Sequence, residues 1–370
     1  MELKSPFVFV CCQPGSEGLL KAELAREMPR LRFAFSRPGF VTFKDAYERP
    51  IESSFELPSV FARAYGLSRG SCKSSDPAAE ALMHARELYA ECGAPLRLHV
   101  WERSRFIPGE EPPDFKEGVF ASAVEASLRS GASEIFHVSS EAEANDLVFD
   151  VVVMEAESGS PLFVGFHRHT SRHHAFAGGQ VPVEMPADSP SRAFVKIEQA
   201  IRWARIPLAR GDVAVEVGSA PGGASFAMLL RGLEVWGIDP GAMSPVVWTH
   251  PQCEKRFHHV KKAFSELKPE DLPSSVQWLA VDINGPARVS LPYVEQAASW
   301  FKSGLLGVIL TLKMNDPKHA RHIPEWIEHV QSWGFKRVRA TQLPANKREI
   351  CLVGLTSKGL LRLQSNPGAS

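Results

Sequence analysis

The sequence predicts an α/β protein in which a parallel sheet with covering helices fills the second half and smaller α+β units precede it. Three observations lead to this fold class. From residue 192 onward, apolar strand-like runs alternate with helical segments. A glycine-rich loop joins the first of these runs to an apolar helix, as in Rossmann-like nucleotide-binding folds. Before residue 192, shorter strands and helices follow one another without an internal repeat.

Length and composition set the broad class of protein. At 370 residues the chain is too long for one ordinary core, so two or three domains are expected. With 44% hydrophobic and 23% charged residues, the composition is that of a soluble globular protein. No apolar run approaches the roughly 20 residues of a membrane helix, and the first residues do not resemble a secretory signal. The six cysteines form no C-x-x-C pair, which favours buried free thiols, so we expect a cytoplasmic protein without a membrane partner.

The first half is expected to hold two small units. Residues 1–70 form an α/β unit, and residues 71–185 form a second unit with a linker. In the first unit, apolar patterning predicts strands at 7–12 and 40–43 and a helix at 15–27. In the second, it predicts helices at 77–92 and 118–129 and strands at 96–101, 147–153 and 162–166.

Residues 186–370 are expected to form the third and largest domain. Its predicted parallel strands lie at 213–217, 234–238, 276–281 and 307–312. A late pair of strands at 336–342 and 349–355 is joined by a short loop that contains Pro344. This pair predicts an antiparallel hairpin that closes the sheet.

The segment 167–191 differs in composition from its neighbours. Four histidines (His167, His169, His173 and His174) are followed by Gly178-Gly179 and by three prolines. We expect a mobile, weakly cationic loop near the substrate. No carboxylate or cysteine completes the histidines at a regular spacing, so the sequence predicts no metal site.

A net charge of zero conceals an uneven distribution of charge. Residues 1–190 carry 19 Lys and Arg against 27 Asp and Glu, whereas residues 191–370 carry 23 against 15. A basic half favours a polyanionic partner, and the acidic half argues against a broad nucleic-acid surface there.

The strongest motif is the loop Glu216-Val-Gly-Ser-Ala-Pro-Gly-Gly-Ala-Ser225, between an apolar strand and an apolar helix. Its glycines allow a tight turn and a close approach to a ligand. Asp239 ends the next strand, where a nucleotide-binding fold places a carboxylate for ribose hydroxyls. The loop lacks G-x-G-x-x-G and any basic residue for a pyrophosphate, which favours S-adenosylmethionine, a cofactor without phosphate. An ordinary Gly-Pro turn is the alternative.

Four charged residues stand at element ends or on the preceding helix: Lys196, Asp282, Lys313 and Glu349. Since strand ends gather around the ligand crevice of a doubly wound sheet, Asp282 and Lys313 should converge there with the glycine loop. Each residue also has a structural explanation. Lys313 could be a strand-end side chain that reaches solvent, Asp282 a helix cap, and Lys196 and Glu349 solvated surface positions.

In their order along the chain, these four residues resemble the Lys-Asp-Lys-Glu tetrad of FtsJ-like ribose 2'-O-methyltransferases. The similarity to that family spans residues 186–356 and includes Ser191-Arg-x-x-x-Lys196 and Gly218-Ser-Ala-Pro-Gly-Gly223. More faintly, the N-terminal half resembles the ferredoxin-like and THUMP region of bacterial enzymes that methylate a cytidine of 23S ribosomal RNA. The resemblance implies an S-adenosylmethionine-dependent enzyme that methylates a ribose 2'-hydroxyl of RNA, with 23S ribosomal RNA or its precursor as partner.

The resemblance also implies roles for single residues. S-adenosylmethionine would be bound by Ser191, Gly218, Ala220, Pro221, Gly222, Gly223, Ala224, Asp239 and Asp282. Lys313 would be the base, made neutral by burial and by the nearby cation Lys196, with Asp282 and Glu349 orienting the lysines and the sugar. Lys262 stands where relatives carry an acidic residue that contacts adenine, so that contact is unassigned. The alternatives are 2'-O-methylation of another RNA and a catalytically silent RNA-binding or ribosome-assembly factor.

Overall fold

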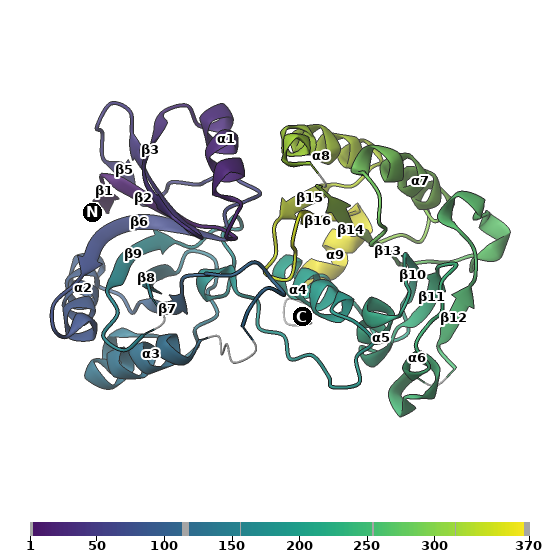
Figure 1. The fold of residues 1–370 in the computed structure, drawn as a ribbon, viewed down its shortest axis with the longest axis horizontal. Helices are drawn as coiled ribbons and strands as arrows, with labels where there is room; N and C mark the ends of the chain where they lie inside the picture. The colour runs from purple at the N-terminus through teal and green to yellow at the C-terminus, as the bar shows by residue number, and fades with distance from the viewer. Residues whose placement is uncertain (1–2, 113–117, 156, 254, 315, 366–370) are drawn as a thin grey trace. The chain divides into compact units, whose positions relative to one another are not determined.

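The structure is a computed structural model that describes residues 3–112, 118–155, 157–253, 255–314 and 316–365. The chain divides into two compact units, Met1–Val181 and Pro182–Ser370. Each unit has its own seven-stranded sheet (Figure 1).

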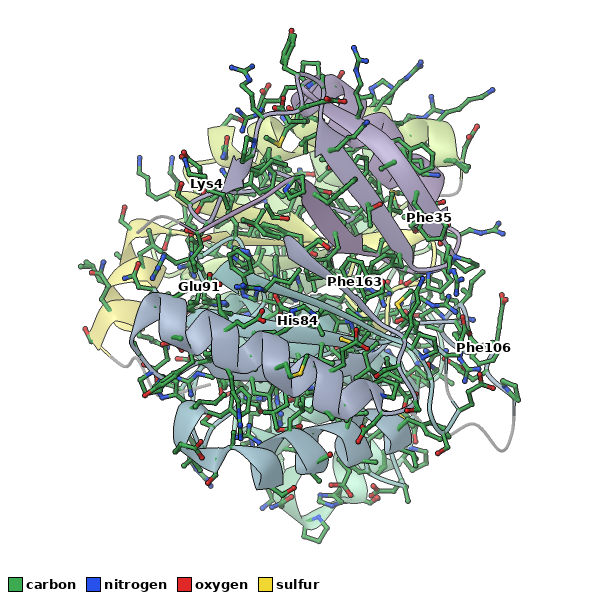
Figure 2. All side chains as sticks on the ribbon, turned by 90° about the vertical axis from the view of Figure 1, so that its left-hand side faces the viewer. Lys4, Phe35, His84, Glu91, Phe106 and Phe163 are labelled. Atoms are coloured by element: carbon green, nitrogen blue, oxygen red, sulfur yellow. The ribbon has the colours of Figure 1, made fainter. Side chains whose placement is uncertain are left out.

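The first unit is built on one mixed sheet with the strand order β3-β4-β2-β6-β9-β8-β7. Its strands are β2 (Phe7–Cys11), β3 (Leu31–Arg37), β4 (Phe40–Asp45), β6 (Ala64–Cys72), β7 (Arg97–Glu102), β8 (Leu147–Val153) and β9 (Leu162–Arg168), and β1 (Lys4–Ser5) pairs separately with β5 (Ile51–Glu52). The helices are α1 (Glu17–Glu27), α2 (Pro77–Cys92) and α3 (Val119–Gly131). Helices α2 and α3 contact each other and the strands of the sheet, and Figure 2 shows α2 crossing in front of the strands, with His84 on it.

The expected boundary at residue 70 falls inside β6, which pairs with β2 on one side and with β9 on the other. Residues before and after position 70 therefore share one sheet. Strand β6 was not predicted because it contains two glycines. A side chain at Gly66 would collide with the Phe166 carbonyl oxygen at 2.8 Å, and Gly70 has a φ of +127° beside a break in the register.

The face of this sheet opposite the helices is covered by residues 169–181, here called the strap. Phe9, Phe40, Trp101 and Val152 form a buried core on this face, and Ala177 of the strap packs against it. The strap contains the short helix η2 (Ala177–Gly179), and a side chain at Gly178 would meet the Trp101 ring at 2.5 Å. Glycine is thus required here because the strap lies directly on the indole.

The second unit has the strand order β12-β11-β10-β13-β14-β16-β15. The first five are parallel, whereas β16 is antiparallel to both β14 and β15. The strands are β10 (Val213–Val217), β11 (Glu234–Ile238), β12 (Phe257–Val260), β13 (Trp278–Val281), β14 (Gly307–Lys313), β15 (Arg337–Thr341) and β16 (Glu349–Leu355). This is a Rossmann-like parallel sheet extended by the predicted hairpin.

Helices cover both faces of this second sheet. On one face, α4 (Ala193–Ala204) packs against α5 (Gly223–Leu230), and α7 (Ala287–Trp300) and α8 (Ile323–Ser332) lie on the other (Figure 1). The remaining helices are α6 (Val246–Thr249) and α9 (Ser357–Ser365). The central strands are buried over nearly their whole length, which is typical of a parallel sheet covered on both faces.

Two further expectations concern the chain as a whole. All six cysteines are free thiols, and five of them are buried, as predicted. Among the residues that the structure describes, no helix combines the length and the apolar character needed to cross a membrane.

Candidate active site

The polar residues singled out in the second half gather at the carboxyl edge of the second sheet. The glycine loop follows β10, Asp239 follows β11, Asp282 follows β13 and Lys313 ends β14. Glu349 begins β16, and because β16 runs antiparallel its first residue lies directly opposite Lys313 in the register. The fold alone therefore brings all five positions to one edge.

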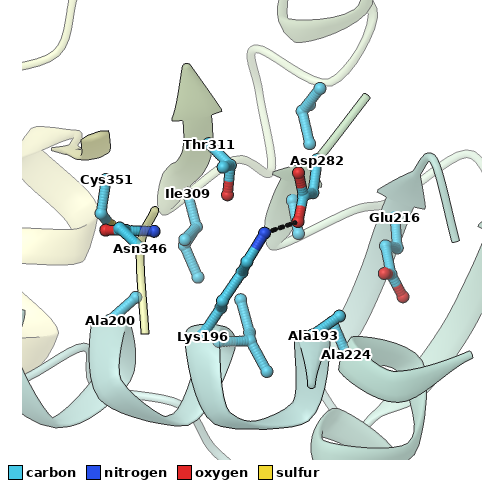
Figure 3. Close-up of a pocket in the computed structure, with 13 residues that line it drawn as sticks. Ala193, Lys196, Ala200, Glu216, Ala224, Asp282, Ile309, Thr311, Asn346 and Cys351 are labelled. Atoms are coloured by element: carbon cyan, nitrogen blue, oxygen red, sulfur yellow. Dashed lines mark hydrogen bonds and ion pairs between the residues drawn. The ribbon is translucent and has the colours of Figure 1, made fainter. Parts of the chain in front are cut away.

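The tetrad of Lys196, Asp282, Lys313 and Glu349 forms a closed ring of alternating charges. Lys313 Nζ lies 2.8 Å from Asp282 Oδ1 and 2.5 Å from Glu349 Oε2. Lys196 Nζ, which reaches the ring from α4, lies 3.2 Å from Asp282 Oδ2 (Figure 3). The same nitrogen lies 2.5 Å from Glu349 Oε1. Each carboxylate thus bridges both lysines. Glu349 is the most buried member, with 6% of its side chain exposed, whereas the other three keep 14–21% exposed.

The ring changes the expected protonation of Lys313. Burial alone lowers the pKa of this ammonium, but the adjacent carboxylates of Asp282 and Glu349 raise it, and the net pKa is above its ordinary value. The expectation that burial and Lys196 make Lys313 neutral is therefore wrong for the ligand-free site. The reason is that two carboxylate oxygens lie within 2.8 Å of Nζ. The order of residues in the sequence could not indicate these distances.

The glycines of the loop make room mainly for other parts of the protein. Gly218 has a φ of +82°, and a side chain there would collide with the backbone carbonyl of Asp282. A side chain at Gly223 would collide with Ser191, just before α4. At Gly222, where φ is +113°, it would meet Val247 Cγ1 at 2.7 Å. These glycines hold the ends of β10, β13 and α4 in close contact.

Asp239 ties the loop to the end of the neighbouring strand. Its Oδ2 accepts a hydrogen bond from the Ala220 amide at 3.1 Å, and its Oδ1 accepts one from the Gly241 amide at 2.7 Å. A carboxylate can accept about four hydrogen bonds, so two positions remain for ligand hydroxyls. Pro221 and Ala224 belong to the same loop–helix junction, beside Ala220 and Gly223.

Glu216 supports the loop from beneath. It is 2% exposed and accepts a hydrogen bond from the Ser225 hydroxyl at the start of α5. Burial raises the pKa of this carboxyl to about 8, even though the bond from Ser225 opposes the shift. Glu216 is therefore uncharged at neutral pH, which lets it lie in the core beneath the loop.

Sequence reasoning missed Asn346. This residue is 1% exposed, its side-chain oxygen accepts a hydrogen bond from the Leu343 amide at 2.9 Å, and its Nδ2 lies 3.5 Å from Glu349 Oε1. Together with Lys196, Glu216 and Asp282 it lines a cavity of about 20 Å³ (Figure 3). That volume admits about one water molecule.

Lys262, which follows β12, is occupied by an ion pair. Its Nζ lies 2.5 Å from Asp271 Oδ1, and the hydrogen bond from Lys262 holds the pKa of Asp271 below its ordinary value. An acidic group thus reaches this part of the site from a later segment, which the position of Lys262 in the sequence could not indicate.

The histidine segment differs from the expected mobile cationic loop. His167, His169, His173 and His174 are all buried in the first unit. Burial lowers the pKa of His167 to about 3 and that of His173 well below its ordinary value, so neither carries charge at neutral pH. These two imidazoles therefore add no positive charge to the segment, whose basic residues are Arg168 and Arg172.

Comparison with known proteins gives a partial match. The chain is 32% identical to ribosomal RNA large subunit methyltransferase M of Teredinibacter turnerae over 171 residues, which are 42% of this chain and 45% of that protein. It is 30% identical to the protein of the same name from Aliivibrio salmonicida over 198 residues, which are 51% and 52% of the two chains. The chain thus spans about half the length of the curated relatives it matches. No family model matches it.

Solved structures add little to this comparison. TrmN from Thermus thermophilus is 14% identical, and the match covers 94% of this chain and 99% of that protein. The TM-score is 0.35, which is too low to assign the same fold to both proteins. The similarity inferred from the motifs is confirmed by the sequence relatives. Over about half of its length, this chain is similar to the bacterial ribosomal RNA large subunit methyltransferases M.

Proposed function

We propose that this protein is an S-adenosylmethionine-dependent RNA ribose 2'-O-methyltransferase that acts on a cytidine of 23S ribosomal RNA or its precursor. The observation that carries the proposal is the closed ring of Lys196, Asp282, Lys313 and Glu349 beside the glycine loop. The similarity to ribosomal RNA large subunit methyltransferase M supports the choice of substrate. The free buried thiols fit a reducing compartment, for which we propose the cytoplasm.

The residues around the loop fit the proposed cofactor. Asp239 has unused acceptor positions for ribose hydroxyls. The loop itself carries no basic side chain, which suits a ligand without phosphate. When bound, S-adenosylmethionine supplies a methyl group on a positively charged sulfur. Ser191, Gly218, Ala220 to Ala224, Asp239 and Asp282 would hold it.

In this proposal the tetrad positions and deprotonates the ribose. A ribose hydroxyl is a weak nucleophile, so a base must accept its proton as the oxygen attacks. Lys313 is the base, and it must first release the proton that Asp282 and Glu349 stabilise on it. Lys196 and the two carboxylates fix the direction of Nζ, since each carboxylate contacts both lysines. Holding the oxygen in line with the methyl group supplies a large further part of the rate.

We expect the rate of methyl transfer to rise with pH. Only neutral Lys313 can accept a proton, and its pKa is raised, so the active fraction is small at neutral pH and grows about tenfold per pH unit. Single-turnover transfer at saturating RNA and cofactor, measured from about pH 6.5 to about pH 9, should have a logarithmic slope near 1. A flat profile would mean that Lys313 acts as a permanent cation.

We expect Asp239→Ala to weaken S-adenosylmethionine binding. The change removes charge-assisted hydrogen bonds worth about 1.5–3 kcal/mol, or roughly 10- to 150-fold in Kd. Asp239→Asn keeps one acceptor oxygen, so its Kd should lie between those of the unmodified protein and Asp239→Ala. Isothermal titration calorimetry measures the Kd of both variants. Glu270→Ala, which changes an exposed residue of the same unit, is the control. Equal affinities for all three variants would move the cofactor site elsewhere.

Transfer of a labelled methyl group tests the proposal as a whole. Tritiated S-adenosylmethionine is incubated with the protein and with RNA from cells that lack it. Label that enters RNA and resists alkaline hydrolysis at the modified linkage identifies a ribose 2'-O-methyl group. Cofactor binding without any transfer would instead identify a catalytically silent RNA-binding factor.

A further inference from the structure

A group of buried polar side chains on the helix-free face of the first sheet has no part in the proposed chemistry. His99 on β7 and Asp150 on β8 are direct partners in the register, and His167 lies on the adjacent strand β9. His169 and His173 reach the same place from the strap. All five side chains belong to buried residues with 2–7% of their surface exposed. We call these five residues the histidine cluster.

The cluster is uncharged and its hydrogen bonding is incomplete. Burial lowers the pKa of His99 to about 4 and that of His167 to about 3, so the imidazoles are neutral lone-pair donors at neutral pH. Within the part of the chain that the structure describes, His167 Nε2 and His173 Nε2 are buried without a hydrogen-bond partner. A buried polar nitrogen without a partner is unfavourable, and a metal ion bound to both nitrogens would offset this cost.

The three histidines nearest the strap are arranged as ligands of one ion. Ligand nitrogens of His167, His169 and His173 all lie within 4.8 Å of one another. Nitrogens around a tetrahedral zinc ion are about 3.3 Å apart, since each Zn–N bond is about 2.0–2.1 Å long. Binding one ion would therefore require these side chains to rotate and bring their nitrogens closer together. The rings of His167 and His173, now stacked with centroids 4.2 Å apart, would turn toward the shared ion.

Two of the ligands have a hydrogen-bond partner at Nδ1, which leaves Nε2 to face an ion. Asp150 Oδ2 lies 2.6 Å from His167 Nδ1, so His167 presents Nε2. This carboxylate–histidine pair is the usual second shell of a metal-bound imidazole. His173 Nδ1 lies 3.2 Å from both the Thr170 amide and the Thr170 hydroxyl. The amide donates to Nδ1 in this structure, so binding of a metal ion at Nε2 requires the other tautomer, in which Nδ1–H donates to the hydroxyl oxygen.

We propose that His167, His169 and His173 bind one divalent transition-metal ion, with zinc as the best match, and that Asp150 orients His167. Neutral imidazoles are the ligands that zinc and its neighbours prefer. A water molecule completes the coordination. Because one ligand belongs to β9 and two to the strap, the ion would fasten the strap to the sheet and thereby stabilise the first unit. This inference does not depend on the proposed methyltransferase activity.

Metal titration of the full-length, tag-free protein tests the site. The protein is stripped with chelator and titrated with Zn²⁺ by calorimetry and with Co²⁺ by visible absorption, which detects tetrahedral coordination. We expect one equivalent of metal bound and a higher melting temperature with Zn²⁺ present. Asp150→Asn should weaken binding about 10- to 100-fold, and the double variant His169→Ala/His173→Ala should abolish it.

Two control variants keep the test specific. His84→Ala removes a separate possible group, Cys72–Glu80–His84, and His137→Ala removes a histidine of the same unit outside the cluster. Both should bind metal as the unmodified protein does. The proposal is overturned if the folded unmodified protein binds no stoichiometric metal, or if binding is lost in His84→Ala. It is equally overturned if a double variant with an unchanged circular dichroism spectrum still binds one equivalent.

Discussion

Replacing Lys313 with alanine should reduce methyl transfer by at least about 10²- to 10⁴-fold, the usual contribution of a general base. Affinity for S-adenosylmethionine should change little, because Lys313 contacts Asp282 and Glu349 and is not part of the glycine loop. Transfer of tritiated methyl to RNA and calorimetry of cofactor binding give the two values. Lys302→Ala, at an exposed lysine of the same unit, is the control and should behave as the unmodified protein.

Lys313→Arg separates a base from a fixed positive charge. Arginine keeps the cation between the two carboxylates but does not lose its proton in proteins. It should therefore be about as inactive as alanine while preserving the thermal stability that alanine loses. Substantial turnover by the arginine variant would show that the tetrad needs only a cation at this position.

A protein shortened to residues 182–370 should bind S-adenosylmethionine with unchanged affinity but lose most of its activity on RNA. This unit contains its own seven-stranded sheet, the glycine loop and all four tetrad residues. Its start at Pro182 retains the hydrogen bond from Arg202 to the Pro182 carbonyl. Selecting one ribose in a large RNA requires contacts beyond a pocket, and we expect the first unit to supply them.

Calorimetry and methyl transfer to the same RNA, each compared with the full chain, measure this division of labour. Full and site-selective methylation by residues 182–370 would assign the first unit to some other partner. Loss of cofactor binding despite a folded spectrum would show that the cofactor site needs the first unit.

Strand bounds were predicted best where a strand coincides with one uninterrupted apolar run. Strands β10 and β11 have the expected bounds because each is an apolar run that a loop residue ends. Strands β1, β3, β5, β6 and β12 were missed. Of these, β6 is interrupted by Gly66 and Gly70, and β12 contains two adjacent histidines. Strands of this kind form because neighbouring strands pair with them, and that cannot be seen in a single segment.

The candidate site shows the same limit more sharply. The order of elements sufficed to place Asp282 and Lys313 at one edge, because parallel strands share their carboxyl ends. The protonation of Lys313 depends on distances to two carboxylates, one of which lies across an antiparallel register. Asp150 and His99 join the later histidines through strand pairing, so spacing along the chain showed His167, His169 and His173 but not these two partners.

The most direct test of the account is a map of ribose 2'-O-methyl groups at nucleotide resolution. It compares ribosomal RNA from cells that contain the protein, cells that lack it and cells that carry only Lys313→Arg. We expect one cytidine of 23S ribosomal RNA to lose its 2'-O-methyl group in the second and third strains, with all other marks unchanged. Identical maps in all three strains would contradict the proposed function.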